Sequence, residues 1–291
     1  MTLKIGKRRY PVHFSRIALY VFIVILLSFT SLPLVYLVCQ AFKPLEELSI
    51  YPPQFFVRNP TLTNFSTLVG AVSSTDIPFL RYVINSVYVT VLSVFLSVVV
   101  CSLAAYGINK LRPAGHAFLN KLIIAALMFS GTVTTIPTYM VVHRLGLINT
   151  YSALIIPKIA VAFNLFLMIQ FMSQLSNSLL EAARIDGANE FKVFWRIVMP
   201  NVKPAWGTLI VFTFVSSWND YFSPLVYTSK AALKTLPLAV QQISGGAGSV
   251  SLTRAGAACA ATLIMTAPTV IIYTVMQGKV IKTMEYSGIK E

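Results

Sequence analysis

The sequence predicts an all-α, polytopic membrane protein that crosses the bilayer six times. Of its 291 residues, 56% are hydrophobic and only 11% are charged, and the apolar residues occur in long uncharged blocks. A helix needs about 20 residues to cross the hydrocarbon core, and these blocks have about that length. Backbone groups in lipid must be hydrogen-bonded internally, and the strict alternation of barrel strands is absent, so we expect helices.

Six uncharged blocks define the expected spans. They are residues 17–42, 82–109, 122–142, 159–180, 205–229 (interrupted by Asp220) and 255–277. The first block follows a cluster of basic residues, as the core of a secretory signal does. However, it is longer than the roughly 7 to 15 apolar residues of a signal core, and no small-residue cleavage site follows it. We therefore expect it to be a retained membrane anchor.

The basic residues predict the orientation of the spans. Fifteen of the 23 Lys and Arg residues fall in four segments that share one side of the membrane when the N-terminus is inside. Positive charge concentrates on the cytoplasmic side, so both termini are expected there. The chain then divides into a cytoplasmic segment 1–16, a transmembrane domain 17–278 and a cytoplasmic tail 279–291. This bias explains the net charge of +14, and no nucleic-acid partner is expected.

The long inner connection, at about residues 174–203, is predicted to contain two short helices. Ser178 and Glu181 have the spacing of a capping box, which opens a helix. Gly187 is expected to end that helix with a positive φ, a conformation that glycine adopts at little cost. Asn189 can cap the second helix.

The second helix is expected to be amphipathic and to end at Pro200. Its apolar residues recur at spacings of three and four, which predicts one shared face: Phe191, Phe194, Trp195 and Val198. Two interpretations remain open on physical grounds. The connection either docks a cytoplasmic protein through its small side chains, or rests its aromatic face on the lipid headgroups.

The run Glu181-Ala-Ala-x-x-Asp-Gly-Ala188, with Phe194 and Pro200 after it, resembles the EAA loop of permease subunits of ABC importers. In that family the loop supplies a coupling helix that sits in a cleft of the ATPase subunit. The resemblance also implies the type I importer permease fold. The residues that it assigns to ATPase coupling are Glu181, Ala182, Ala183, Asp186, Gly187, Ala188, Phe194 and Pro200.

The resemblance extends over nearly the whole chain and favours the carbohydrate-uptake branch, in particular the smaller permease of maltose-type importers. The segments that carry it are 60–65, 85–86, 104–106, 145–150, 218–222 and 235–237. It implies a second homologous permease, a dimer of cytoplasmic ATPase subunits, an external solute-binding protein and a carbohydrate substrate, in the bacterial cytoplasmic membrane. The tail, with Gly288, Ile289 and Lys290, is similar to the family's usual ending, which contacts the ATPase pair.

Asp220 is the only acidic residue inside a predicted span, where a charge costs at least about 2.5 kcal/mol on insertion scales. It should therefore face a cavity, a partner or the bundle interior. Aromatic rings can stack on sugars, and amide and carboxylate groups can bind hydroxyls. The resulting candidates for a substrate pathway are Trp218, Asn219, Asp220, Tyr221 and Asn85. Alternatively, Asp220 lies near the outer headgroups or bonds a neighbouring helix, with Lys230 the next basic residue along the chain.

The sequence contains no motif for chemistry of its own. GxxxxGK[ST] is absent, so we expect no cofactor in this chain and assign ATP and Mg²⁺ to the partner ATPase. Neither GxSxG nor a metal-ligand spacing of His and Cys occurs, so no catalytic or metal-binding residue is expected. Two other classes remain as alternatives: a secondary transporter that uses Asp220 with an ion gradient, and an intramembrane enzyme.

Overall fold

The computed structural model describes residues 2–5, 8–11, 14–72, 77–244 and 252–288, with side chains in 17–69, 77–243 and 255–278. It forms two compact units. One unit comprises residues 1–70 and 246–263, and the other comprises residues 71–245 and 264–291.

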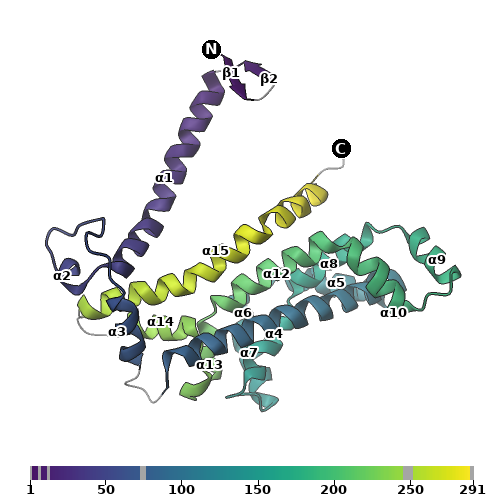
Figure 1. The fold of residues 1–291 in the computed structure, drawn as a ribbon. Helices are drawn as coiled ribbons and strands as arrows, with labels where there is room; N and C mark the ends of the chain where they lie inside the picture. The colour runs from purple at the N-terminus through teal and green to yellow at the C-terminus, as the bar shows by residue number, and fades with distance from the viewer. Residues whose placement is uncertain (1, 6–7, 12–13, 73–76, 245–251, 289–291) are drawn as a thin grey trace. The chain divides into compact units, whose positions relative to one another are not determined.

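Helices make up most of the described residues, as predicted (Figure 1). In chain order the elements are β1 (Thr2–Ile5), β2 (Arg8–Pro11), α1 (Phe14–Phe42), α2 (Leu45–Leu48), α3 (Thr63–Val72), α4 (Phe79–Tyr106), η1 (Gly107–Leu111), α5 (His116–Leu127), α6 (Gly131–Arg144), α7 (Tyr151–Ile159), α8 (Ala162–Ser173), α9 (Asn177–Ile185), α10 (Glu190–Val193), η2 (Phe194–Val198), α11 (Met199–Asn201), α12 (Lys203–Trp218), α13 (Phe222–Tyr227), η3 (Ala231–Leu233), α14 (Leu236–Ser244) and α15 (Leu252–Gly288).

A short antiparallel hairpin precedes the first helix, and the all-α prediction omitted it. Strand β1 pairs with β2, so that Thr2 lies opposite Pro11 and Ile5 opposite Arg8. The argument that excluded strands holds only in hydrocarbon, where the backbone has no water to bond. A polar segment outside the membrane is free of that restriction.

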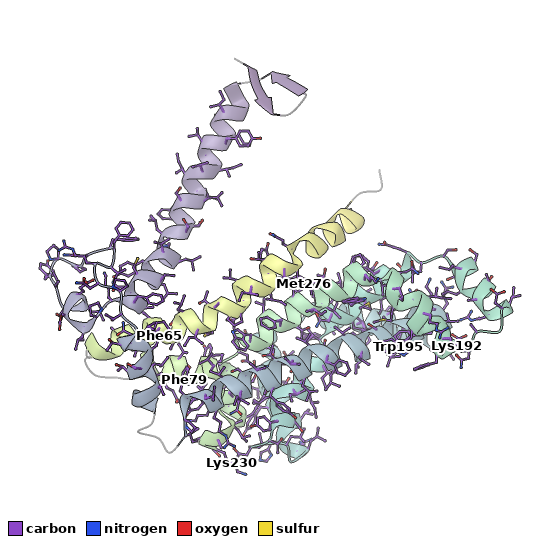
Figure 2. All side chains as sticks on the ribbon, in the orientation of Figure 1. Phe65, Phe79, Lys192, Trp195, Lys230 and Met276 are labelled. Atoms are coloured by element: carbon purple, nitrogen blue, oxygen red, sulfur yellow. The ribbon has the colours of Figure 1, made fainter. Side chains whose placement is uncertain are left out.

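Helix α1 is apolar on every side along most of its length. Large side chains such as Phe22 and Phe29 are exposed along it. Figure 2 shows side chains on both sides of this helix. An exposed helix that is hydrophobic all round belongs in a bilayer. The stretch Ile17–Phe42 thus confirms the first predicted span in length and composition.

In the first unit, Asn64 of α3 stabilises the end of α1. Its buried amide donates hydrogen bonds to the carbonyls of Ala41 (3.0 Å) and Lys43 (2.7 Å). The Ala41 carbonyl lies in the last turn of α1 and the Lys43 carbonyl just after it, so neither has a partner within the helix. Gly256 of α15 leaves room for the amide, since a Cβ at that position would lie 2.3 Å from Asn64 Oδ1.

Helix α4 is the centre of the second unit and packs against α7, α8 and α12 (Figure 1). Asn164 of α8 ties these helices together. Its amide donates to the hydroxyls of Ser97 on α4 (3.2 Å) and Thr213 on α12 (3.0 Å). Interhelical hydrogen bonds of this kind join polar side chains within apolar helix bundles.

Four helical stretches among the described residues are long and apolar enough to span a membrane: Ile17–Phe42, Phe79–Leu111, Tyr151–Ser173 and Ala255–Gly278. The second and last agree closely with the prediction. The third begins before the predicted Ile159 and ends at Ser173, whereas the predicted block continued into α9. Hydropathy marks uncharged residues, and it does not mark the turn at which a span ends and an inner helix begins.

The two remaining predicted spans are interrupted. Helices α5 and α6, which cover block 122–142, form a broken pair bent by 114°. Block 205–229 is divided between α12 and the short α13, with Asn219–Tyr221 between them. The described residues therefore contain four candidate spans, or five with the bent pair, in place of the six that were predicted.

Candidate functional site

The inner connection folds as predicted into two helices, α9 and α10, around a glycine turn. Gly187 has φ +80°, and its amide donates to the carbonyl of Arg184 at 3.0 Å. The amide of Ala188 donates to the carbonyl of Ala183 at 3.0 Å, which closes the end of α9. A Cβ at position 187 would meet nothing within 4 Å. The backbone conformation, and not a lack of space, requires glycine there.

The predicted capping box at the start of α9 is wrong. The N-cap is Ser176, and no side chain caps the helix through a hydrogen bond. The hydroxyl of Ser178 instead bonds that of Ser176 at 2.5 Å. Because the helix starts before Ser178, that residue and Glu181 lie inside it and cannot take the Ncap and N3 positions that a capping box requires.

The second inner helix is capped as predicted, since Asn189 Oδ1 accepts the amide of Lys192 at 2.9 Å. Its apolar face differs from the prediction. Val193, Phe194 and Val198 are buried, whereas Phe191 and Trp195 are exposed and pack on each other. The π-helical turn η2 changes the spacing after Val193, so a regular 3.6-residue pattern assigns the face incorrectly.

Pro200 does not end the second helix, contrary to the prediction. It lies at the start of α11, which follows η2 directly and runs to Asn201. A proline is tolerated at the first positions of a helix because the missing amide hydrogen has no intrahelical partner there.

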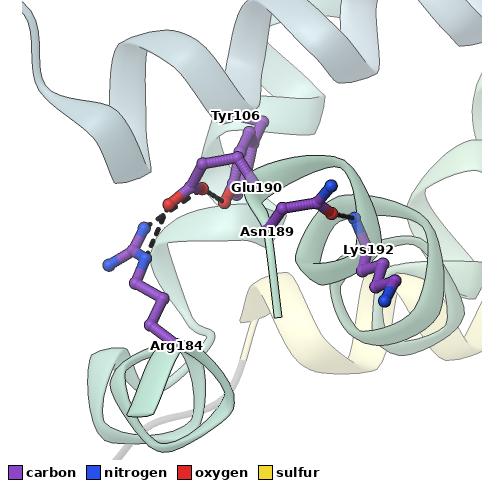
Figure 3. Close-up of polar contacts among 5 residues, drawn as sticks. All are labelled: Tyr106, Arg184, Asn189, Glu190 and Lys192. Carbon is purple, nitrogen blue, oxygen red and sulfur yellow. Dashed lines mark hydrogen bonds and ion pairs between the residues drawn. The ribbon is translucent and has the colours of Figure 1, made fainter. Parts of the chain in front are cut away.

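A hydrogen-bonded trio joins the two inner helices to α4 (Figure 3). The Arg184 guanidinium donates to both Glu190 oxygens, from Nε to Oε1 at 2.7 Å and from Nη2 to Oε2 at 3.3 Å. The hydroxyl of Tyr106, the last residue of α4, donates to Glu190 Oε2. Arg184 and then Tyr106 lower the pKa of Glu190, and Glu190 in turn raises the pKa of Arg184. The Arg184–Glu190 pair therefore remains ionised at neutral pH.

Most residues of the EAA-like run are exposed. Glu181, Ala182, Asp186 and Gly187 are exposed, and Ala183 and Ala188 are partly exposed. Ile185 projects from among them with 86% of its surface exposed. Ala182 and Gly187 have little or no side chain, so another protein's backbone can approach this surface closely.

The same helices are also built into the core of the second unit. Leu180 of α9 and Phe194 after α10 are fully buried in one cluster with Tyr106 of α4 and Met168 of α8. The Tyr106 and Phe194 rings pack with centroids 5.4 Å apart. The exposed surface is therefore held on a well-packed base, which the sequence pattern did not establish.

Asp220 forms an ion pair with Lys158, a residue that the sequence placed in an outer segment. Lys158 Nζ lies 2.8 Å from Asp220 Oδ2, and the two side chains are 15% and 14% exposed. Asp220 Oδ1 also accepts the amide of Ser223 at 3.0 Å. Of the alternatives considered, the structure has the bond to a neighbouring helix, but with Lys158 of α7 instead of Lys230.

The neighbours of Asp220 do not form one polar cluster. Trp218 is buried, and its indole Nε1 donates to the carbonyl of Met265 on α15 at 2.8 Å. The Asn219 amide donates to Val215 of its own helix at 2.9 Å. Only Tyr221 has an exposed ring among the aromatic residues of this group.

Asn85 is buried near the start of α4, and its side-chain amide is fully engaged. Its Nδ2 donates to the carbonyls of Ala232 (2.9 Å) and Lys234 (2.8 Å), and its Oδ1 accepts the Tyr151 hydroxyl at 2.8 Å. The amide of Leu236 donates to Ser86 next to it at 2.8 Å. These bonds hold the η3 loop on α4.

The predicted ATPase contact of the C-terminal tail lies where the structure describes no side chains. Gly288 is the last residue of α15, and Ile289 and Lys290 lie outside the described residues.

Among the residues that the structure describes, no group of three or more His, Cys, Asp or Glu side chains is arranged to hold a metal ion.

Apolar spans, a connection of short helices with exposed small side chains and a buried interhelical network are the features of a helical membrane protein. The chain belongs to the family of binding-protein-dependent transport system inner membrane components, whose model matches residues 5–286. It is therefore a permease of the bacterial plasma membrane and not a catalytic ATPase.

Relatives of known identity agree with this assignment. Protein LplC of Bacillus subtilis is 34% identical over 217 residues, which cover 75% of this chain and 71% of that protein. The B. subtilis polygalacturonan/rhamnogalacturonan transport system permease protein YtcP is 31% identical over 270 residues, covering 89% and 92%. A chain in the crystal structure of a bacterial ABC transporter that imports alginate has the same fold. Its TM-score is 0.80 at 22% identity, with 92% of this chain and 98% of that chain covered.

Proposed function

We propose that the chain is a permease subunit of an ATP-driven importer of carbohydrates and forms half of the passage with a second, homologous permease. The names of its relatives support the substrate class, since they include the YtcP permease and a lactose permease, LacG, that is 28% identical. A similar alginate transporter has been crystallised with a periplasmic protein bound to an alginate pentasaccharide. An external binding protein that delivers the sugar is therefore part of the proposal.

The proposed topology has six crossings, with both termini in the cytoplasm. The bent pair α5 and α6 makes one crossing, and α12 with α13 makes another. The charge bias of the loops supports this arrangement. The C-terminal segment, with Gly288, Ile289 and Lys290, is proposed to contact the ATPase.

The exposed surface of α9 is proposed to be the contact for the ATPase. Glu181, Ala182 and Asp186 would face the partner, with Ala183, Gly187 and Ala188 allowing its backbone to approach. The single observation that carries this proposal is the exposed Ile185 among these small residues, on a helix anchored by the buried Leu180. Phe194 and Pro200 then act within this chain, as a core anchor and at the start of α11.

The test is Ala183→Trp in the complete importer, reconstituted in vesicles with its ATPase and binding protein. We expect normal insertion but loss of both ATPase retention and sugar uptake, because the indole would fill the space that a partner's backbone needs. Ala114→Trp, at an exposed alanine outside the inner helices, is the matched control and should behave as the wild type.

Normal uptake by the Ala183→Trp importer would refute the docking role. Uptake that persists without ATP and stops when the ion gradient is collapsed would instead establish a secondary transporter.

For the sugar pathway, the proposal gives different roles to the predicted residues. The open ring of Tyr221 can stack on a sugar, whereas Trp218, Asn219 and Asn85 bond backbone carbonyls and support the wall. Asp220 is proposed to act through its pair with Lys158.

A further inference from the structure

The Glu190 carboxylate is shared by three helices. Glu190 is the first residue of α10, and it accepts hydrogen bonds from Arg184 in the last turn of α9 and from Tyr106 at the end of α4. One side chain therefore links α9, α10 and the end of α4 (Figure 3).

A second contact joins the same parts of the chain. Lys110, in the π-helical turn η1 that continues α4, donates to the carbonyl of Leu175 at 2.6 Å and to Asn177 Oδ1 at 3.0 Å. Leu175 and Asn177 flank the start of α9. The N-terminal end of α9 is thus held by Lys110, and its C-terminal end by Arg184 through Glu190.

Both π-helical turns of the described residues lie next to these contacts between α4, α9 and α10. Turn η1 follows Tyr106, and turn η2 begins at Phe194, whose ring packs on the Tyr106 ring. Isolated π-helical turns occur frequently at functional sites. Here they lie where the end of α4 meets the inner helices, on either side of the Tyr106 to Phe194 contact.

We propose that Glu190 is a positioning residue that transmits displacement of α9 to the inner end of α4, through Arg184 on one side and Tyr106 on the other. This inference rests on the proposed docking of an ATPase at α9. A push on the exposed surface of α9 moves Arg184, and the carboxylate passes the movement to Tyr106 and the span. Without the carboxylate, α9 still docks but its movement is taken up by the Gly187 turn.

If Glu190 only stabilised the fold, its removal would lower the stability of the protein. The Arg184 and Glu190 side chains are 37% and 48% exposed, and exposed pairs contribute little to stability because water already solvates both charges. The base of the element is held by buried apolar side chains instead. Removal of the carboxylate should therefore spare folding and change the transmission of force.

The experiment compares Glu190→Gln and Tyr106→Phe in the complete importer in vesicles. It measures ATP hydrolysed per sugar imported, the amount of ATPase that co-purifies, and the thermal unfolding midpoint. We expect both variants to raise the ATP consumed per sugar about threefold or more, with ATPase retention unchanged and the midpoint shifted only slightly. Lys192→Gln removes an exposed charge from the same helix and should match the wild type (Figure 3).

A double variant separates the two halves of the link. Arg184→Glu with Glu190→Arg restores an ion pair between α9 and α10 but leaves the Tyr106 hydroxyl without its acceptor. It should couple as poorly as Tyr106→Phe, since the connection to the span stays broken.

Wild-type coupling in Tyr106→Phe, which removes one oxygen atom, would overturn the inference even if Glu190→Gln failed to fold. So would an increase in ATP per sugar accompanied by an equal loss of ATPase retention, because that result assigns the trio to docking. If the wild-type chain retains no ATPase at all, the proposed function itself fails.

Discussion

The molecule contains two acid–base pairs that use the same chemistry in opposite settings. Arg184 and Glu190 lie six residues apart in sequence at the inner connection, with 37% and 48% of their side chains exposed. Lys158 and Asp220 come from distant parts of the chain, inside the bundle, and are 15% and 14% exposed. The distances are nearly equal, at 2.7 and 2.8 Å.

This difference in burial determines what each pair can do. A charge removed from water stays costly until a partner compensates it, so loss of one member of the buried pair leaves the other destabilising. The exposed pair has water as an alternative partner, so it sets geometry at little gain in stability. Equal distances therefore do not imply equal energies.

The largest expected effect is that of Asp220→Ala, which leaves Lys158 without its partner. We expect a loss of about 3–5 kcal/mol in stability, because an uncompensated ammonium would remain in the bundle. Membrane abundance and the thermal unfolding midpoint in detergent measure it. The double variant Lys158→Met with Asp220→Leu should recover most of the loss. Unchanged abundance of the single variant would show that water or lipid headgroups already solvate Lys158.

The next effect is that of Gly187→Ala, in the turn between the two members of the exposed pair. The φ of +80° is unfavourable for alanine by about 1–2 kcal/mol, although space for the methyl group is available. We expect faster hydrogen exchange in α9 and a higher ATP cost per sugar, with normal insertion. Gly146, another exposed positive-φ glycine, gives the control as Gly146→Ala, which should leave exchange in α9 unchanged.

A smaller effect is expected from Arg184→Ala. Because the pair is exposed, the free energy of unfolding should fall by no more than about 1 kcal/mol. Chemical denaturation in low and high salt tests this, and the difference from the wild type should shrink as salt screens the pair. A loss as large as that of Asp220→Ala would remove the contrast between the two pairs.

The smallest expected effect concerns pH. The Arg184 and Tyr106 hydrogen bonds lower the pKa of Glu190 in the folded chain. Such a group contributes stability above its unfolded pKa of about 4.3, and the contribution is lost as pH falls through the lower folded pKa. The unfolding midpoints of the wild type and Glu190→Gln should therefore differ slightly at pH 7 and converge at more acidic pH. A difference that grows on acidification would contradict the assigned direction.

The sequence predicted the local features of the exposed region well. The Gly187 turn and the Asn189 cap follow from residues within a few positions of each other, where backbone preference decides the conformation. The prediction of a capping box was wrong because α9 starts before Ser178. The prediction that Pro200 ends the second helix was wrong because a π-helical turn leads directly into α11, which contains the proline.

Long-range pairing could not be predicted in the same way. The predicted span began only at Ile159, because Lys158 is charged. Lys158 was therefore assigned to the loop before the span and was not considered as a partner for Asp220. Its position in the stretch Tyr151–Ser173 could have been found, because the residues before it are also largely apolar. The Tyr106–Glu190 contact has no sequence signal, since it depends on how α10 packs against α4.

The 114° bend between α5 and α6 limits what can surround this chain. Around it the helical ladder is broken, and Met128 and Phe129 lie uncovered on the surface of the chain. Acyl chains can solvate those side chains but offer no donor or acceptor to an interrupted backbone. Within a membrane, any backbone carbonyl at the break that has no partner in the chain would therefore need water or the polar wall of a second subunit.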